Sequence, residues 1–343
     1  MGLGLPRSAA FVSLSGARVS VLLPVRDCER TVARAASDIL GQSLRALELI
    51  AVDDGSRDSS AAILEQLARS DSRLKVIRSA EPRGVAHAAN LAFSHAQAPF
   101  IARMDADDEC DPRRLALSLD ALEADPSLSG VGTQVEVFRD DCPVSPNLQR
   151  YADWLNSLTT AAALYADRLV ESPLCNPSLT LRREAFAWSG GWREGDFPED
   201  WDLFVRLLDS GRRLRCIEPR LTRWRDHDAR VTRTDLRYGL ERHLDLKARF
   251  LKPLLRRPIS VWGAGEIGLK LSRRLGGVDR FIDVNPRKIG MKIDGAPVVG
   301  LEDVGGPRGH LVAAVGAKGA RAKIRGFLCA AGWEEGRDFT CAA

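Results

Sequence analysis

The sequence predicts an α/β protein with a doubly wound, mostly parallel sheet, followed by a small second α/β domain. Two observations lead to this fold class. Apolar, β-branched runs recur about every 27 residues between positions 19 and 105 and alternate with segments of helical spacing. The strand-then-helix order begins again at residue 258. The chain has 343 residues, of which 45% are hydrophobic, so it can bury the cores of two domains.

Four apolar runs are the expected strands of the first sheet. They are continuous stretches rather than alternating ones, which is typical of parallel strands buried on both faces. Between them, residues 29–40 and 58–70 place apolar side chains on one helical face, and an acid and two serines at 58–60 suit a helix cap. Strands that alternate with helices are joined by right-handed crossovers. The runs are 19–25, 47–53, 74–79 and 100–105.

Three of these expected strands end in polar residues. The ends are Arg26-Asp27, Asp53-Asp54 and the acidic stretch 105–108. Ligands of doubly wound sheets bind beyond the carboxyl ends of the strands. We therefore expect these side chains to converge on one edge of the sheet.

The acidic stretch after the fourth strand contains Asp105, Asp107, Asp108 and Glu109. One interpretation is a solvated turn before the next helix, in which Asp111 and Pro112 would fit the N-cap and N1 positions. Asp111 alone satisfies that cap, which leaves Asp105 and Asp107 unexplained. Two carboxylates one residue apart can share Mg²⁺ or Mn²⁺, which prefer oxygen ligands and commonly bind substrate phosphates.

Composition narrows the expected location. No stretch approaches the roughly 20 apolar residues of a membrane-spanning helix, and residues 1–17 lack a signal-peptide pattern. The seven cysteines are scattered without a C-x-x-C pair, so we expect reduced, structural thiols. These features predict a cytoplasmic protein.

Residues 206–257 are basic, with 16 Lys or Arg against 7 Asp or Glu, in a chain whose net charge is only +4. A solvated surface explains most of these arginines. Their excess also favours an anionic neighbour, such as a diphosphate donor, a lipid-diphosphate acceptor, an acidic glycan or the inner membrane face, where the protein would be peripheral. We expect no nucleic acid partner, because aromatic interleaving and a recognised binding motif are absent.

Residues 18–232 resemble the family 2 glycosyltransferases of the GT-A fold, which take a sugar from a nucleotide-diphosphate donor. Five motifs follow the family's order. "VSVLLPVRDCE" resembles its first strand and loop, and "LELIAVDDGSRDSS" its nucleotide-binding acid pair. "EPRGVAHAANLAFSHA" is similar to its glycine-asparagine helix, and "ARMDADDECDPRRL" to its D-x-D motif. "GGWREGDFPEDWDLFVRLL" resembles the acceptor-side segment that carries the catalytic acid.

The resemblance implies roles for individual residues on the donor side. Asp54 is similar to the acid that hydrogen-bonds the nucleobase, with Asp53 beside it, and helix capping is the alternative. Asp107 resembles the direct metal ligand, and Asp105 the residue that faces the ribose or a metal-bound water. His227 resembles a histidine that some members bring to the metal or diphosphate, with packing or surface exposure as the alternative. The other donor-site residues implied by the motifs are Pro24, Arg26, Gly84 and Asn90.

Asp200 in "PED" resembles the general base, and Glu199 and Asp202 are its rivals. Sugar transfer needs a cation to offset charge on the leaving diphosphate and a carboxylate to take the proton of the attacking hydroxyl. A base opposite the leaving group implies inversion at the anomeric carbon. The resemblance thus implies metal-assisted hexosyl or N-acetylhexosaminyl transfer to a glycan or lipid-linked acceptor.

A second motif lies near the C-terminus. "VWGAGEIG" follows an expected strand and opens a helix, and Asp283 ends the next strand. In dinucleotide-binding turns, glycines let the backbone approach a diphosphate and the acid binds a ribose hydroxyl. The segment resembles the Rossmann-like domains attached to sugar-modifying acyltransferases and nucleotide-sugar enzymes. Gly263, Gly265, Gly268 and Asp283 are a candidate second nucleotide site, and a scaffold or oligomerisation role is the alternative.

These observations divide the chain into an N-terminal tail (1–17), a GT-A domain (18–232), a basic helical linker (233–257) and a Rossmann-like domain (258–343). In the linker, the helical stretch over 235–255 places Leu236, Leu240, Leu244 and Leu251 near one face.

Two other functions compete with glycosyl transfer. The first is an oxidoreductase or nucleotide-sensing module centred on residues 258–343, which lacks a catalytic pair because it contains only His310 and no Tyr-x-x-x-Lys. The second is a nucleotidyltransferase, which is disfavoured because no glycine-rich start occurs near residue 24.

Overall fold

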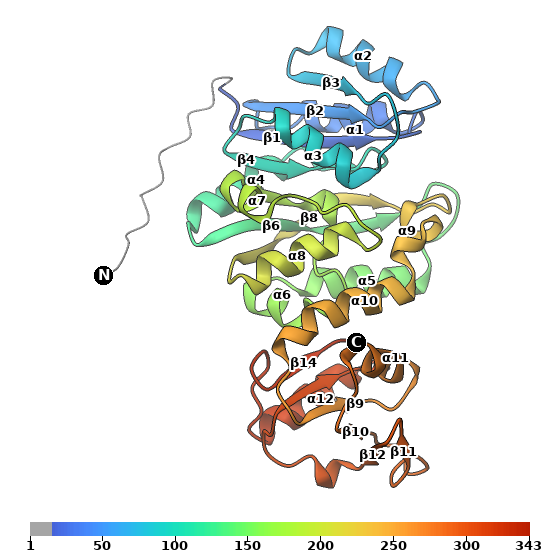
Figure 1. Cartoon of the computed structure of the whole chain (residues 1–343). Helices are drawn as coiled ribbons and strands as arrows, with labels where there is room; N and C mark the ends of the chain where they lie inside the picture. Colours follow the sequence, from blue (N-terminus) through green and yellow to red (C-terminus); the bar gives the residue numbers. More distant parts are fainter. Residues whose placement is uncertain (1–15) are drawn as a thin grey trace. The chain divides into compact units, whose positions relative to one another are not determined.

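The computed structural model describes residues 16–343 (Figure 1). These residues form two compact units. Unit 1 comprises residues 16–159, 174–194 and 211–227, and unit 2 comprises 160–173, 195–210 and 228–343. Each unit is thus assembled from three stretches of chain. The linear domain limits expected from the sequence remain a proposal, and most of the expected tail at 1–17 lies outside the described residues.

Unit 1 is built on an eight-stranded sheet in the order β3-β2-β1-β4-β7-β6-β8-β5. Its first four strands run parallel to one another and match the four expected runs. The predicted α/β class with a mostly parallel first half is confirmed. The strands are β1 (Val19–Val25), β2 (Leu47–Asp53), β3 (Leu74–Arg78) and β4 (Phe100–Arg103).

Helices α1 (Val32–Leu40), α2 (Ser60–Ser70) and α3 (Val85–His95) follow the first three strands as crossovers. Helix α3 packs against β1 and β2, whereas α1 contacts β2 and α2. This arrangement leaves the carboxyl ends of β1, β2 and β4 at one edge of the sheet, as the strand pattern predicts.

The other half of the sheet is mixed. Strand β7 (Thr180–Arg182) runs antiparallel to β4 and to β6 (Leu128–Phe138). Strand β8 (Arg213–Arg225) is parallel to β6, and β5 (Glu109–Cys110) pairs antiparallel with β8. The remaining elements of unit 1 are α4 (Arg114–Ala124), α5 (Pro146–Ser157), the 3-10 turn η1 (Asn176–Ser178) and α7 (Arg183–Ser189).

The start of α4 differs from the expectation that Asp111 is its N-cap. The N-cap residue is Arg113, and Asp111 instead accepts a hydrogen bond from Arg113 N at 2.8 Å. Gln42 Oε1 accepts from Leu115 N at 2.9 Å, within the first turn of the helix. A side chain distant in the sequence therefore satisfies an N–H group that local capping was expected to satisfy.

The start of α2 follows the expected sequence pattern only in part. Ser59 occupies the N-cap position but its side chain makes no capping hydrogen bond. The acid of the pattern supplies the bond instead, since Asp58 Oδ1 accepts from Ser60 N at 2.9 Å.

Unit 2 contains helices α6 (Ala161–Asp167), α8 (Glu199–Asp209), α9 (Val231–Thr234) and α10 (Leu240–Leu251), with the 3-10 turns η2 (Leu236–Tyr238) and η3 (Lys252–Leu254). The helical stretch expected over 235–255 is interrupted at Gly239. Leu244 and Leu251 are buried, but Leu236 and Leu240 are exposed, so the predicted common face is wrong for these two leucines.

A six-stranded sheet forms the C-terminal part of unit 2, in the order β11-β12-β10-β9-β13-β14. All adjacent pairs are parallel except the edge pair β11 and β12. The elements are β9 (Ile259–Trp262), α11 (Glu266–Leu275), β10 (Arg280–Ile282), β11 (Lys292–Ile293), β12 (Ala296–Val299), η4 (Leu301–Asp303), β13 (His310–Ala313), α12 (Ala320–Ala330) and β14 (Phe339–Cys341).

One hydrophobic core connects α8 with this second sheet. Trp201 and Val205 of α8 belong to the same cluster of buried side chains as Leu244 of α10, Val261 of β9 and Phe281 of β10. Burial of these large side chains stabilises both elements together. The helix that carries the expected base is therefore supported by C-terminal residues.

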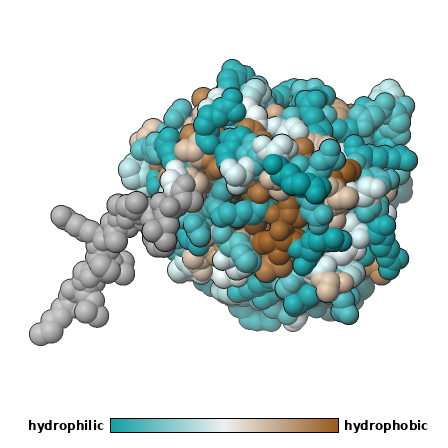
Figure 2. Space-filling model, turned by 90° about the horizontal axis from the view of Figure 1, so that it is seen from above, coloured by the Kyte–Doolittle hydropathy of each residue, from teal (hydrophilic) through white to brown (hydrophobic). Residues whose placement is uncertain are grey.

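In the part of the chain that the structure describes, no helix is long and apolar enough to cross a membrane. Seen from above in Figure 2, the surface is mainly hydrophilic, with one hydrophobic patch near its centre. All seven cysteines are free thiols, as the sequence predicts.

Candidate active site

The acidic loop after β4 forms a compact group of carboxylates. One oxygen from each of Asp105, Asp107 and Asp108 lies within 4.8 Å of the others, close enough for one cation to contact all three. A hard divalent cation prefers such oxygen ligands. The donor set of this loop therefore fits Mg²⁺ or Mn²⁺.

Asp105 is held by a buried arginine. Its Oδ1 lies 2.5 Å from a guanidinium nitrogen of Arg103, which is the last residue of β4 and is almost fully buried. The Arg103 guanidinium also lies 5.9 Å from the ring centroid of Trp192. A buried guanidinium requires charged and polar partners, so Arg103 fixes the orientation of the first carboxylate.

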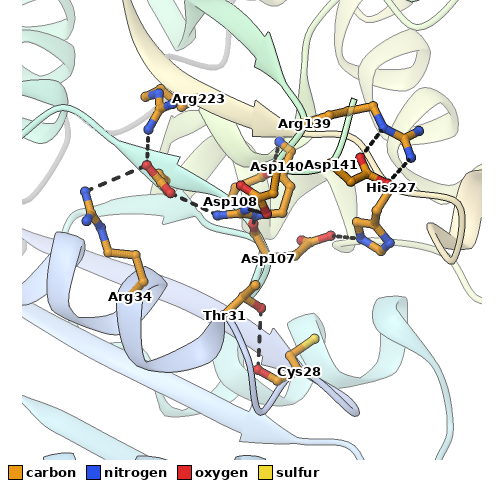
Figure 3. Close-up of polar contacts among 12 residues, drawn as sticks. Cys28, Thr31, Arg34, Asp107, Asp108, Arg139, Asp140, Asp141, Arg223 and His227 are labelled. Atoms are coloured by element: carbon orange, nitrogen blue, oxygen red, sulfur yellow. Dashed lines mark hydrogen bonds and ion pairs between the residues drawn. The ribbon is translucent and has the colours of Figure 1, made fainter. Parts of the chain in front are cut away.

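His227 lies beside the second carboxylate (Figure 3). Its Nε2 is 3.1 Å from Asp107 Oδ2, and both side chains are partly exposed to solvent. Imidazole and carboxylate on one side of the loop are a ligand pair that a divalent cation can use. The structure thus brings together the two residues that the sequence assigns to the metal.

Arg225, at the end of β8, links this strand to the acidic loop through hydrogen bonds and an ion pair. Its backbone N–H donates to Asp108 Oδ1 at 2.8 Å, and its Nε donates to the Asp107 carbonyl oxygen at 2.7 Å. Its guanidinium also forms an ion pair with Glu109 at 2.9 Å. These contacts place His227, two residues further on, next to the carboxylates.

The roles of Arg225 and Asp108 are not predicted by the sequence. The only signals available were the run of arginines after residue 206 and the surplus acids after Asp105. Neither signal identifies which arginine meets which acid, because the partners lie more than 100 positions apart.

Cys28 lies near the acidic loop but is not suited to react (Figure 3). Burial, followed by the negative charge of Asp107, raises the pKa of its thiol to about 12. A thiol with this pKa stays protonated at neutral pH and is a poor nucleophile. Its backbone N–H donates to Ser60 Oγ at 2.8 Å, so Cys28 joins the loop that follows β1 to the first residue of α2.

The two acids at the end of β2, Asp53 and Asp54, lie in different environments. Asp54 accepts hydrogen bonds from the backbone N–H groups of Arg83 and Gly84, at 2.9 and 2.8 Å. It thereby fixes the glycine turn that opens α3. Asp53 is also buried, and among the described residues its Oδ1 has no hydrogen-bond partner, while its Oδ2 lies 4.0 Å from Arg78.

The other residues expected on the donor side lie on neighbouring elements. Pro24 is buried in β1 opposite Val52, whereas Arg26 is exposed beyond the strand end, 3.7 Å from Asp27. The Asn90 side-chain amide forms two hydrogen bonds with the backbone of Trp192. Its Nδ2 donates to the Trp192 carbonyl oxygen at 2.6 Å, and its Oδ1 accepts from the Trp192 N–H at 3.1 Å. Asn90 therefore positions the Trp192 loop, and its predicted contact with the nucleotide stays a prediction.

The acids expected on the acceptor side lie on α8, in unit 2. Asp200 is partly buried, and its Oδ1 accepts from Trp201 N at 2.7 Å. Glu199 is buried and accepts from the Tyr238 hydroxyl at 2.7 Å. Asp202 is fully buried and pairs with Arg206 at 2.7 Å. Of the three acids, Asp200 is the most accessible.

The second predicted nucleotide motif forms a tight turn between β9 and α11. A Cβ on Gly268 would lie 1.8 Å from the Gly263 carbonyl oxygen, whereas a Cβ on Gly265 would meet nothing within 4 Å. Asp283 accepts from Ala264 N at 3.0 Å and lies 3.3 Å from Lys288 Nζ. Asp283 therefore braces the turn in this structure.

The first unit combines a large mixed α/β sheet with an aspartate trio beyond the strand ends. This is the architecture of the GT-A glycosyltransferases. Comparison with known proteins agrees with that class: the model of the family "Glycosyl transferase family 2" matches residues 20–187.

Two curated relatives and one solved structure extend the comparison. The chain is 32% identical over 231 residues to the putative glycosyltransferase EpsE of Bacillus subtilis, covering 66% of this chain and 80% of that protein. It is 29% identical over 239 residues to the succinoglycan biosynthesis protein ExoU of Rhizobium meliloti, covering 67% of this chain and 66% of that protein. The crystal structure of S. aureus TarS 1-349 with UDP-GlcNAc shares the fold, with a TM-score of 0.55 and 15% identity over 75% of this chain and 71% of that chain.

The chain belongs to glycosyltransferase family 2. The match to EpsE covers most of that relative, and the likeness to TarS concerns the fold.

Proposed function

We propose that this protein is an inverting glycosyltransferase that moves a hexosyl or N-acetylhexosaminyl group from a nucleotide-diphosphate sugar to a hydroxyl acceptor. The observation that carries the proposal is the group of three carboxylates with His227 beyond the strand ends. A bound Mg²⁺ or Mn²⁺ would offset the charge that develops on the leaving diphosphate. Asp107 and His227 would hold the cation, and Asp105 would face the ribose or a metal-bound water.

The donor nucleotide would occupy the edge formed by the ends of β1 and β2. Asp53 and Asp54 would face the base, and Arg26, exposed at the rim, would meet the diphosphate. Gly84 supports this arrangement because its backbone is fixed by Asp54, at the N-terminus of α3, where N–H groups favour an anion. Pro24 and Asn90 would shape the pocket through the backbone.

Asp200 would act as the general base. Its carboxylate would accept the proton of the acceptor hydroxyl while the hydroxyl oxygen bonds to the anomeric carbon and the bond to the diphosphate breaks. The burial of Glu199 and Asp202 and their bonds to Tyr238 and Arg206 support the choice of Asp200. Attack from the face opposite the leaving group gives inversion.

The acceptor would be a glycan or lipid-linked precursor of a polysaccharide, a class that the name of the relative ExoU supports. A lipid-linked acceptor would require contact with the membrane face. Exposed apolar residues Val231, Leu236 and Leu240, within the basic stretch 206–257, are suited to that contact.

We also propose that the second sheet is Rossmann-like, because its parallel strands β12, β10, β9, β13 and β14 follow a doubly wound order. A nucleotide at its glycine turn is the extension of this proposal. An oxidoreductase centred there is not favoured, since the histidine of this segment, His310, is fully buried.

Calorimetric titration with UDP and GDP, each with and without Mn²⁺, tests the donor site. Asp107→Ala should abolish the Mn²⁺-dependent affinity and leave the melting temperature within about 2 °C of wild type. Asp120→Ala, which removes an exposed carboxylate of α4, is the matched control. Unchanged affinity in Asp107→Ala would overturn the metal assignment.

A further inference from the structure

We propose that Tyr238 is a positioning residue for Asp200 and acts through the neighbouring carboxylate of Glu199. The inference rests on the proposed function, because it takes Asp200 as the general base. It concerns residues of unit 2 alone, namely η2, α8 and the core that supports them.

The contact between Tyr238 and Glu199 satisfies a buried charge. The Tyr238 hydroxyl donates to Glu199 Oε2 at 2.7 Å, and Glu199 is only 4% exposed. Hydrogen bonds to a buried carboxylate compensate for the solvation that its ionised form loses. The Tyr238 hydroxyl supplies one such bond and so helps to hold Glu199 in place in the first turn of α8.

The donor side of this bond is itself fixed. Asp235 caps η2 by accepting from Arg237 N at 2.9 Å, and its carboxylate also binds the Arg237 guanidinium at 2.7 Å. That guanidinium lies 5.9 Å from the Tyr238 ring centroid. Burial, followed by the negative charges of Glu199 and Asp200, raises the pKa of Tyr238, so the hydroxyl keeps its proton and remains a donor.

Asp200 is held from its other side by Trp201. The Trp201 backbone N–H donates to Asp200 Oδ1, and the buried indole Nε1 donates to the Arg168 carbonyl oxygen at 2.7 Å. Lys247 Nζ lies 5.5 Å from the Trp201 ring and donates to the carbonyl oxygens of Val170 and Ala342, at 2.9 and 2.7 Å. Asp200 thus lies between two residues whose side chains are both anchored.

Loss of the Tyr238 hydroxyl would release one of these anchors. Glu199 would then lose one of its hydrogen bonds, and the first turn of α8 would shift with its side chain. Small displacements of a positioned base reduce the rate of the chemical step. Donor binding should be unaffected, because the residues proposed for it belong to unit 1.

The test measures nucleoside diphosphate release by the full-length protein from a panel of UDP- and GDP-sugars with Mn²⁺. Tyr238→Phe should lower kcat roughly tenfold and leave the KM for the donor within about twofold. In an Asp200→Asn background the same change should alter the residual turnover by less than about twofold, because residues that act as a unit are not additive. Tyr165→Phe, which removes a hydroxyl elsewhere in unit 2, is the matched control.

The outcomes separate this inference from the proposed function. If Asp200→Asn keeps wild-type turnover, the assigned base is wrong and the inference fails with it. If Asp200→Asn loses turnover but Tyr238→Phe does not, the inference alone is overturned. An equal tenfold loss from Tyr238→Phe in both backgrounds would also overturn it, since Tyr238 would then act independently of Asp200. Glu199→Leu, which removes the acceptor of the Tyr238 hydroxyl, should reproduce the Tyr238→Phe phenotype.

Discussion

His227 Nε2 lies 3.1 Å from Asp107 Oδ2, although 120 positions separate the two residues in the chain. Their meeting depends on Arg225, which fastens β8 to the acidic loop through Asp108 and the Asp107 carbonyl oxygen. The proposed metal site is therefore a product of strand pairing as well as of the D-x-D motif.

His227→Ala should weaken Mn²⁺-dependent binding of UDP or GDP by roughly 10- to 100-fold, because one proposed ligand or ligand neighbour is removed. Calorimetry at fixed Mn²⁺ measures the effect. His95→Ala, on the exposed end of α3, should leave the affinity unchanged. Equal affinities in the two variants would remove His227 from the site.

We expect Asp202 to have a structural role and Asp200 a chemical one. Asp202→Asn removes the buried negative charge that pairs with the Arg206 guanidinium and should lower the free energy of unfolding by about 3 kcal/mol. Asp200→Asn should lower turnover by roughly 10² or more, with donor binding retained. Urea denaturation and turnover of both variants measure this. A larger turnover loss in Glu199→Gln would identify Glu199 as the base.

The glycines of the second motif allow a test for a second ligand. Gly265→Val should be tolerated by the fold, since a Cβ there meets no atom within 4 Å, yet it would obstruct a diphosphate. Gly268→Val should destabilise the protein, because a Cβ would overlap the Gly263 carbonyl oxygen. Asp283→Ala is a less selective test than the sequence suggests, because Asp283 also braces Ala264 and Lys288.

The measurement is titration of NAD, NADP, UDP and UDP-sugars into full-length Asp107→Ala, in which the proposed donor site should no longer show Mn²⁺-dependent binding. Saturable binding that Gly265→Val removes would support a second nucleotide site. Lack of binding near millimolar concentration would leave the turn with a structural role.

His310 should make stability depend on pH. Burial, followed by the charge of Arg256, lowers its pKa from 6.5 to about 4. Between pH 6.5 and pH 4 the unfolded chain binds a proton at His310 that the folded chain does not bind. The stability that the neutral, buried His310 contributes is therefore complete above pH 6.5 and is lost as the pH falls toward 4. From pH 7 to pH 5 the free energy of unfolding should fall by about 2 kcal/mol through this residue.

Urea denaturation of wild type and His310→Gln at both pH values isolates the effect from that of other groups. The variant should show the smaller loss. An identical pH dependence in the two proteins would show that His310 does not titrate in this way.

The exposed Leu236 should contribute to binding at an anionic lipid surface. Leu236→Glu should weaken sedimentation with phosphatidylglycerol vesicles roughly tenfold, because it removes apolar contact and adds a negative charge. Val284→Glu, at another exposed apolar residue of unit 2, is the matched control. Absence of wild-type binding to these vesicles would argue against a peripheral membrane role.

Much of the first sheet could be predicted from the sequence. Strands β1 and β2 agree with their predicted limits at both ends, because every residue in them is buried and the apolar runs are uninterrupted. The acids at the strand ends were found for the same reason, since topology places such ends together. Helix starts were less predictable: the N-terminus of α4 depends on Gln42, which no local pattern indicates.

The sequence predicted which residues belong to the candidate site better than it predicted which of them contact one another. The D-x-D acids carry a local signal, but the bonds from Asn90 to Trp192 and from Tyr238 to Glu199 join segments about 100 and 39 positions apart. Hydrogen bonds of this kind depend on tertiary packing, so a single sequence contains no direct record of them.

The shared core of α8 and the second sheet has a consequence for recombination between relatives. A chimera joined at residue 257 would keep Trp201 and Val205 but replace Val261 and Phe281, the side chains of their own cluster. Such an exchange would alter the setting of the helix that carries Asp200, even though the junction lies far from it in the sequence. A chimera that preserves the hydrophobic core of unit 2 must therefore exchange all three of its stretches together, namely 160–173, 195–210 and 228–343.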